Sequence, residues 1–169
     1  MNRLAALAVA VSLLAAGCSK NNTTAPSATN PSFTASLSPA NEVPAIGNAE
    51  SVGRGTVTVN FDTTYAAGNV TAASATFTVN LTGFPANTPI NAAHIHPGAV
   101  GVNGTVLVST GLAAGQVVLT NGSGTFTRGP ISMTPEVAQQ IINNPQNFYF
   151  NVHSTINPGG AARGQLVRQ

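Results

Sequence analysis

The sequence predicts an all-β domain, a Greek-key β-sandwich or barrel of about seven to nine antiparallel strands with one short helix. Two observations favour this class. Apolar residues recur at every second position in short runs, which is the pattern of strands with one buried face. Segments rich in Gly and Pro lie between these runs, as expected for the turns of a sandwich or barrel.

The alternating apolar runs define the expected strands in chain order. They are Phe33, Ala35, Leu37; Val57, Val59, Phe61; Ala75, Phe77, Val79, Leu81; Val106, Val108; and Phe148, Phe150, Val152. Turn segments follow at 53–55, 83–85, 97–104, 122–124 and 158–160. Residues 32–169 have the length of one domain, so we expect a single core.

One helix is expected between Thr134 and Asn144. Thr134 is a favourable N-cap, Pro135 fits the first helical position, and Glu136 complements the positive end of the helix dipole. Val137 and Ile141 share one face, so we expect the helix to close one end of the sandwich.

The amino-terminal residues predict export and lipidation. Arg3, an apolar run over 4–16 and small residues before Cys18 form a signal peptide, residues 1–17. This run is shorter than the roughly 20 residues of a membrane-spanning helix. The segment resembles a bacterial lipobox, which implies that Cys18 carries a lipid anchor with palmitate. Cys18 is the single cysteine, so no disulfide is expected within the chain.

Residues 18–31 are expected to be the lipidated cysteine and a flexible tether, because their small polar residues and prolines have no apolar periodicity. Ser19, rather than Asp, follows the cysteine. In a host with two membranes this favours the outer one. The predicted product is therefore an extracytoplasmic, secreted lipoprotein whose β domain, 32–169, is held near a bacterial membrane.

Charge and motifs exclude several classes of function. The chain without its leader holds five basic and four acidic residues, and no basic cluster that would bind nucleic acid. It has no G-x-S-x-G motif, no phosphate-binding glycine loop and no paired carboxylates. We therefore expect a non-enzymatic module, whose protein or small-molecule ligand the sequence does not name.

The three histidines form the candidate site. His94 and His96 are two residues apart on one strand and so share a face, while His153 follows a strand whose core face is Phe148, Phe150 and Val152. If the two strands lie together, three imidazoles converge as ligands for one copper or zinc ion. The alternative is a purely structural network, in which His153 bonds to Arg163 or to loop backbone.

Arg163 has two interpretations of its own. Its guanidinium offers five donors, which suit loop carbonyls or a carboxylate such as Glu42 in a structural clamp. The alternative is an anchor for an anionic ligand beside the histidines.

Three motifs together resemble a known family. LSPANEVPA at 37–45, AHIHPGAVGVNGTVL at 93–107 and NVHSTINPGGAARGQL at 151–166 resemble the CHRD domain, named for chordin. The resemblance implies an all-β extracellular module and a motif set of His94, His96, Asn151, His153 and Arg163. The family usually has an acidic residue before the arginine, where this chain has alanine.

The AHIHPG segment is also similar to the copper-binding strand of copper-zinc superoxide dismutases. Three histidines and one lipidated cysteine do not supply the ligands of a binuclear dismutase. The sequence thus predicts a membrane-anchored binding or structural module whose histidines form either a mononuclear metal site or a structural network. The alternatives are a copper-dependent redox enzyme and a purely structural envelope protein.

Overall fold

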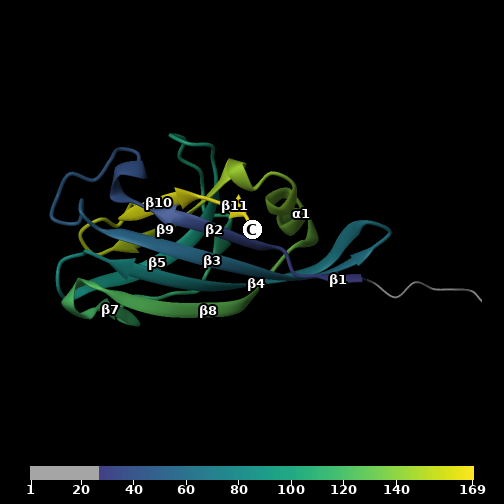
Figure 1. Cartoon of the computed structure of the whole chain (residues 1–169), viewed down its shortest axis with the longest axis horizontal. Helices are drawn as coiled ribbons and strands as arrows, with labels where there is room; N and C mark the ends of the chain where they lie inside the picture. Colours follow the sequence, from purple (N-terminus) through teal and green to yellow (C-terminus); the bar gives the residue numbers. More distant parts are fainter. Residues whose placement is uncertain (1–26) are drawn as a thin grey trace, which may run out of the picture.

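The computed structural model describes residues 27–169, which form two antiparallel sheets packed face to face (Figure 1). This confirms the predicted all-β sandwich with a single α-helix. The predicted signal peptide, Cys18 and the tether as far as residue 26 lie outside the described residues.

The first sheet holds six strands in the order β11-β2-β3-β4-β8, and β1 pairs with the far part of β3. Successive antiparallel pairing of β2, β3 and β4 makes a long meander. The strands are β1 Ser27–Thr29, β2 Ser32–Leu37, β3 Arg54–Ala66, β4 Asn69–Thr82, β8 Gly124–Met133 and β11 Val167–Arg168.

The second sheet holds five strands in the order β10-β9-β5-β6, and β7 pairs with another part of β5. The chain enters this sheet after β4, returns to the first for β8, and comes back for β9 and β10. The strands are β5 Thr88–Pro97, β6 Val108–Ser109, β7 Val117–Leu119, β9 Phe148–Ser154 and β10 Ala162–Gln165.

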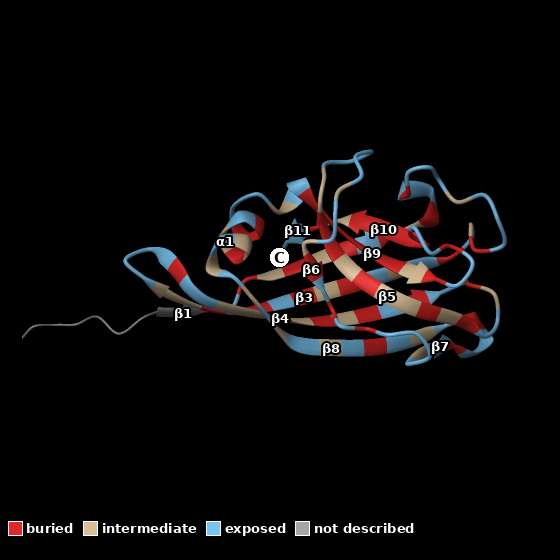
Figure 2. Cartoon of the chain, turned by 180° about the vertical axis from the view of Figure 1, so that it is seen from behind, coloured by how far each residue is buried: buried red, intermediate tan, exposed pale blue. Residues whose placement is uncertain are grey.

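The core lies between the sheets and follows the predicted alternation. Phe33, Val59 and Phe77 are fully buried, and bands of buried residues alternate with exposed ones along the strands of the first sheet (Figure 2). The rings of Phe77 on β4 and Phe150 on β9 stack with centroids 5.8 Å apart, which joins the two sheets directly.

Strand β9 departs from the expected pattern because both of its faces are buried. Phe150 and Val152 face the core, but Tyr149 and Asn151 on the outer face are also only 3% and 2% exposed. Segment 98–107, between β5 and β6, and the turn of η1, Pro39–Asn41, supply contacts to this face. The histidine cluster sits on this covered polar surface.

Helix α1, Pro135–Asn143, forms as predicted. The hydroxyl of Thr134 accepts a hydrogen bond from the N–H of Val137, and Pro135 takes the first turn. Ile141 is buried, and the helix packs against β4 at one end of the sandwich (Figure 1).

Two expectations about strands need correction. Seven strands have four or more residues, but β1, β6, β7 and β11 add short pairings, so eleven strands are found rather than seven to nine. Val106 is 52% exposed and precedes β6, because segment 98–107 loops away from the sheet. Within the segment expected to be a tether, residues 27–29 pair with the free edge of β3 as β1, through backbone bonds that need no apolar pattern.

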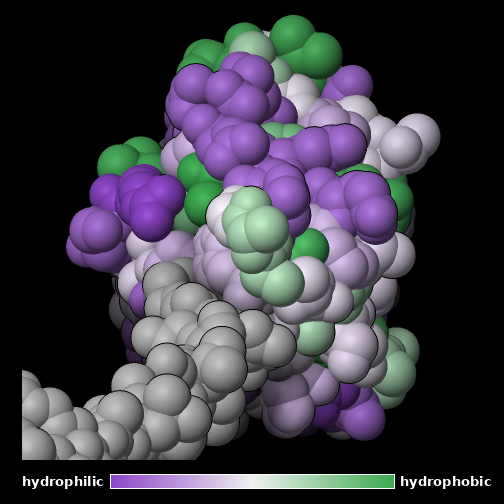
Figure 3. Space-filling view, turned by 90° about the vertical axis from the view of Figure 1, so that its right-hand side faces the viewer, coloured by the Kyte–Doolittle hydropathy of each residue, from purple (hydrophilic) through white to green (hydrophobic). Residues whose placement is uncertain are grey.

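Figure 3 views the molecule from the end at which β1 lies. Hydrophilic residues cover much of this face, and the apolar residues stand in small separate groups. None of the helices within residues 27–169 is long and apolar enough to cross a membrane.

Candidate metal centre

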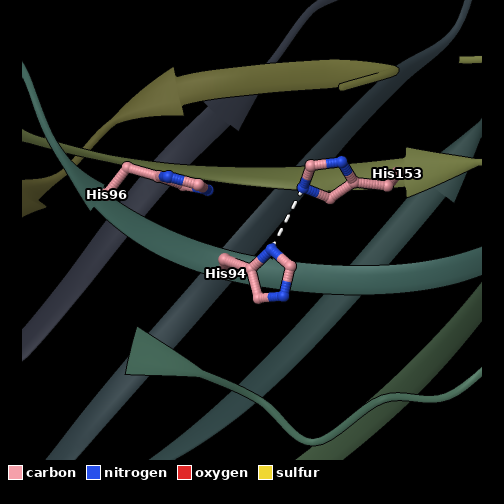
Figure 4. A group of neighbouring side chains, drawn as sticks. All are labelled: His94, His96 and His153. Carbon is pink, nitrogen blue, oxygen red and sulfur yellow. Dashed lines mark hydrogen bonds between the residues drawn. The ribbon is translucent and has the colours of Figure 1, made fainter. Parts of the chain in front are cut away.

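Antiparallel pairing of β5 and β9 brings the three histidines together. The register places His94 opposite Asn151 and His96 opposite Tyr149, with His153 opposite Ala92 after a shift between residues 90 and 92. One nitrogen from each imidazole lies within 4.8 Å of the others. Figure 4 shows the rings of His94 and His153 facing one another across the two strands, with His96 beside them. The predicted convergence is therefore found.

Loop carbonyls fix the proton on two of the rings. Nδ1 of His96 lies 3.0 Å from the carbonyl oxygen of Gly104, and Nδ1 of His153 lies 2.9 Å from that of Pro158. A carbonyl oxygen only accepts, so Nδ1 of each ring is the donor and holds the hydrogen. In the neutral ring Nε2 then presents a lone pair.

These lone pairs converge on another acceptor. Nε2 of His96 and Nε2 of His153 each lie 3.0 Å from Oδ1 of Asn151. Nδ1 of His94 lies 3.1 Å from Nε2 of His153. In the metal-free chain Nδ1–H of His94 therefore donates to Nε2 of His153, whereas Nε2 of both His96 and His153 points at Oδ1 of Asn151 with no hydrogen to share. A cation at this point would stabilise these lone pairs.

Burial keeps two of the rings neutral. It lowers the pKa of His94 from 6.5 to about 4, with repulsion from His153 and His96 adding to the effect. Burial also lowers the pKa of His153, against the bond to Pro158, which favours the charged ring. Both rings are therefore unprotonated at neutral pH, the state in which imidazole binds metals.

His96 belongs to a buried stack of three side chains. Its ring lies parallel to that of Tyr149, with centroids 4.9 Å apart and an interplanar angle of 6°. On the other side, Cζ of Arg163 lies 4.5 Å from the Tyr149 centroid. The hydroxyl of Tyr149 accepts from the N–H of Gly104, the residue whose carbonyl holds His96. His96 therefore has its ring plane and its proton both fixed.

Arg163 acts on loop carbonyls, one of its predicted roles. It is 2% exposed, and Nε donates to the carbonyl of Asn41 at 2.6 Å while Nη1 donates to Oδ1 of Asn103 at 2.8 Å and to the carbonyl of Val102 at 3.3 Å. The other interpretation made Arg163 an anchor for an anionic ligand beside the histidines. No contact between Arg163 and a histidine supports it, because Tyr149 separates Arg163 from His96.

Glu42 lies near Arg163 without a direct hydrogen bond to it. Within residues 27–169 its Oε1 has no hydrogen-bond partner, and neither has Nη2 of Arg163. Burial raises the pKa of Glu42 from 4.5 to about 7, although the positive charge of Arg163 opposes the rise. The two residues share the lining of a cavity of about 260 Å³.

Sequence reasoning did not single out Glu50. It is fully buried, and its Oε2 accepts from Oγ of Ser154 at 2.7 Å and from Nδ2 of Asn157. These residues begin the loop that carries Pro158. The one signal available was that Glu50 is among four acidic residues in a chain with few charges.

Comparison with known proteins gives one match. A family model, the CHRD domain, matches residues 33–166, a range that contains every side chain of the cluster and of its two supporting loops. No curated protein and no solved structure matches the chain.

Proposed function

The chain belongs to the CHRD domain family, a binding or structural module, and from this premise we propose that it is a lipid-anchored metal-binding protein. The proposal places one copper or zinc ion at His94, His96 and His153. It places the domain outside the cytoplasm, anchored through Cys18 to a bacterial membrane, the outer one in a host with two.

The observation that carries the metal site is the direction of the lone pairs. With Nδ1 protonated on His96 and His153, two Nε2 atoms and Oδ1 of Asn151 meet without a hydrogen between them. In proteins, a histidine that ligates a metal donates its other ring N–H to a carbonyl or carboxylate in this way. The metal-free alternative requires the Asn151 amide to turn over so that Nδ2 donates to the rings.

The donor set favours a first-row transition metal. Three imidazoles suit copper and zinc, and Cu²⁺ binds such sites more tightly than Zn²⁺. Three nitrogens that share an ion at about 2.0 to 2.1 Å lie roughly 3.3 to 3.6 Å from one another in tetrahedral or trigonal geometry. The present spread of up to 4.8 Å must therefore close by about 1 Å when the ion binds.

A copper-dependent redox enzyme is the second candidate. Its supporting observation is that His94 and His153 are only partly buried, so one side of the cluster faces solvent. A bound copper ion would keep a position there for a small molecule. Catalysed redox cycling by the copper-loaded chain, absent in His94→Ala, would favour the enzyme over the binding module.

Metal analysis of the purified full chain tests the proposal. We expect one copper or zinc ion per chain after dialysis in the wild type and in the control Asn91→Ala, which removes a polar side chain from the same strand. His94→Ala and His153→Ala should each lose the ion. If neither the wild type nor the control holds stoichiometric metal, and the histidine variants only melt at a lower temperature, the cluster is structural.

Fractionation tests the anchor separately. The wild-type chain should sediment with membranes and Cys18→Ala should not. Equal distribution of both would remove the lipid anchor from the proposal while leaving the metal site untouched.

A further inference from the structure

Two loops supply the carbonyl oxygens that orient the ligand histidines, and each loop is held by a different buried charge. Segment 98–107 brings Gly104 to His96, and the loop at 154–160 brings Pro158 to His153. Arg163 holds the first loop and Glu50 holds the second.

Arg163 contacts segment 98–107 immediately before Gly104, whose carbonyl bonds to His96. Its Nη1 donates to the carbonyl of Val102 and to the side chain of Asn103, the two residues preceding Gly104. Its guanidinium also packs on Tyr149, whose hydroxyl accepts from the Gly104 N–H. Residues 102–104 are therefore held by one side chain and by the ring that it covers.

Glu50 makes the corresponding contacts on the other side. Its Oε2 accepts from Oγ of Ser154 and Nδ2 of Asn157. These two residues also bond to each other: the Asn157 N–H donates to Oγ of Ser154, and the Ser154 N–H donates to the carbonyl of Asn157. Pro158 follows directly. The Glu50 N–H in turn donates to Oδ1 of Asn48, which holds the backbone from which the carboxylate extends.

A contribution to stability does not by itself explain why Arg163 and Glu50 are buried. Neither has a contact with an opposite charge within hydrogen-bonding distance among the described residues, and each keeps one polar atom without a partner. Burying such groups is costly, and apolar replacements of similar volume are often neutral or stabilising. Their common feature is the loop carbonyl that each one places.

We propose that Arg163 and Glu50 are positioning residues of the metal centre, which separately set the tautomer and ring orientation of His96 and His153. The inference rests on the proposed function for its purpose, but the tautomers themselves exist without metal. Partners that hydrogen-bond to ligand histidines change metal affinity by about 10- to 100-fold when removed, and Arg163 and Glu50 hold the loops that supply such partners.

Nitrogen NMR of the histidine rings in the metal-free full chain tests the proposal, together with zinc affinity by competition with a chelator. Arg163→Lys keeps the charge but loses the planar fork. It should shift His96 toward a mixture of tautomers and leave His153 unchanged. Glu50→Gln should do the reverse. Each should weaken zinc binding about tenfold or more.

Matched controls separate positioning from loss of fold. Arg168→Lys and Glu136→Gln make the same chemical changes at exposed sites and should alter neither ring. Tyr149→Phe keeps the stacked ring but removes the partner of the Gly104 N–H, so it should affect His96 alone.

Selective tautomer changes support the inference even if the wild type binds no zinc, which would instead refute the proposed function. If both rings change together in each variant, or neither ring changes, the inference is overturned. If zinc binds equally well to all variants while the tautomers respond, the claim that these residues tune the metal centre fails.

Discussion

Replacing Glu42 by Gln should remove the pH dependence that this carboxyl imposes on folding. Glu42 is 8% exposed and its pKa rises from 4.5 to about 7, chiefly through burial. Between these values the folded chain holds a proton that the unfolded chain releases. The folded state binds more protons there, so Glu42 makes the free energy of unfolding fall as pH rises from 4.5 through 7.

The size of the effect follows from the same shift. One pKa unit corresponds to about 1.4 kcal/mol, so the ionised Glu42 costs the folded chain on the order of 3 kcal/mol above pH 7. Gln has nearly the same shape and preserves the close packing against Gly160. The difference in the free energy of unfolding between Glu42→Gln and wild type should therefore grow by about 3 kcal/mol, in favour of the variant, as pH rises from 5 to 8.

Urea denaturation at pH 5, 6, 7 and 8 measures this difference. Terms from the lowered pKa values of His94 and His153 run in the opposite direction, but they occur in both proteins and cancel in the comparison. Glu136→Gln is the control, because Glu136 is exposed and its pKa is lowered. A stability difference between wild type and Glu42→Gln that stays constant from pH 5 to pH 8 would refute the burial argument.

Three further changes probe the support of the site, the helix and the anchor. A Cβ at Gly104 would overlap the carbonyl of Pro97, so Gly104→Ala should displace segment 98–107. In a competition assay this variant should bind zinc about tenfold or more weakly than wild type. Gly47→Ala, where a Cβ meets open space, should leave zinc binding unchanged. Thr134→Ala removes the N-cap of α1 and should lower the free energy of unfolding by about 1 kcal/mol in urea; an unchanged value would mean that the cap is not used. Cys18→Ser should release the chain from washed membranes, as Cys18→Ala should; retention would contradict lipid anchoring.

Local patterns in the sequence were sufficient for β2, β3, β4 and β9 and for the shared face of the histidines. A period of two predicts that His94 and His96 project together and that His153 avoids the Phe150 face. What places His153 against His94 is the register of β5 on β9, across a separation of 59 residues. That register is set by packing of the whole core, which no local window of sequence contains.

The groups that orient the rings could not be found by residue type. The carbonyls of Gly104 and Pro158 are backbone atoms, which every residue has, and only the loop path makes them special. Arg163 was predictable as a clamp on carbonyls because an arginine with no acidic residue near it in the sequence needs other acceptors. Glu50, set among small polar residues, resembles an exposed turn residue, and its burial depends on contact with Ser154 and Asn157.

The covered outer face of β9 links the fold to the proposed function. An antiparallel sheet can leave one face in water, and that arrangement would spare His96, Asn151 and Arg163 the cost of desolvation. Here two loops cover that face. Their carbonyls hydrogen-bond to the histidine rings, and the covered face holds polar side chains rather than an apolar core. Two of the imidazoles, His94 and His153, are held neutral, and all three lie close together without an ion, which is the main requirement of the proposed metal site. The polar side of β9 is therefore where selection for function, rather than for stability, is expected to act.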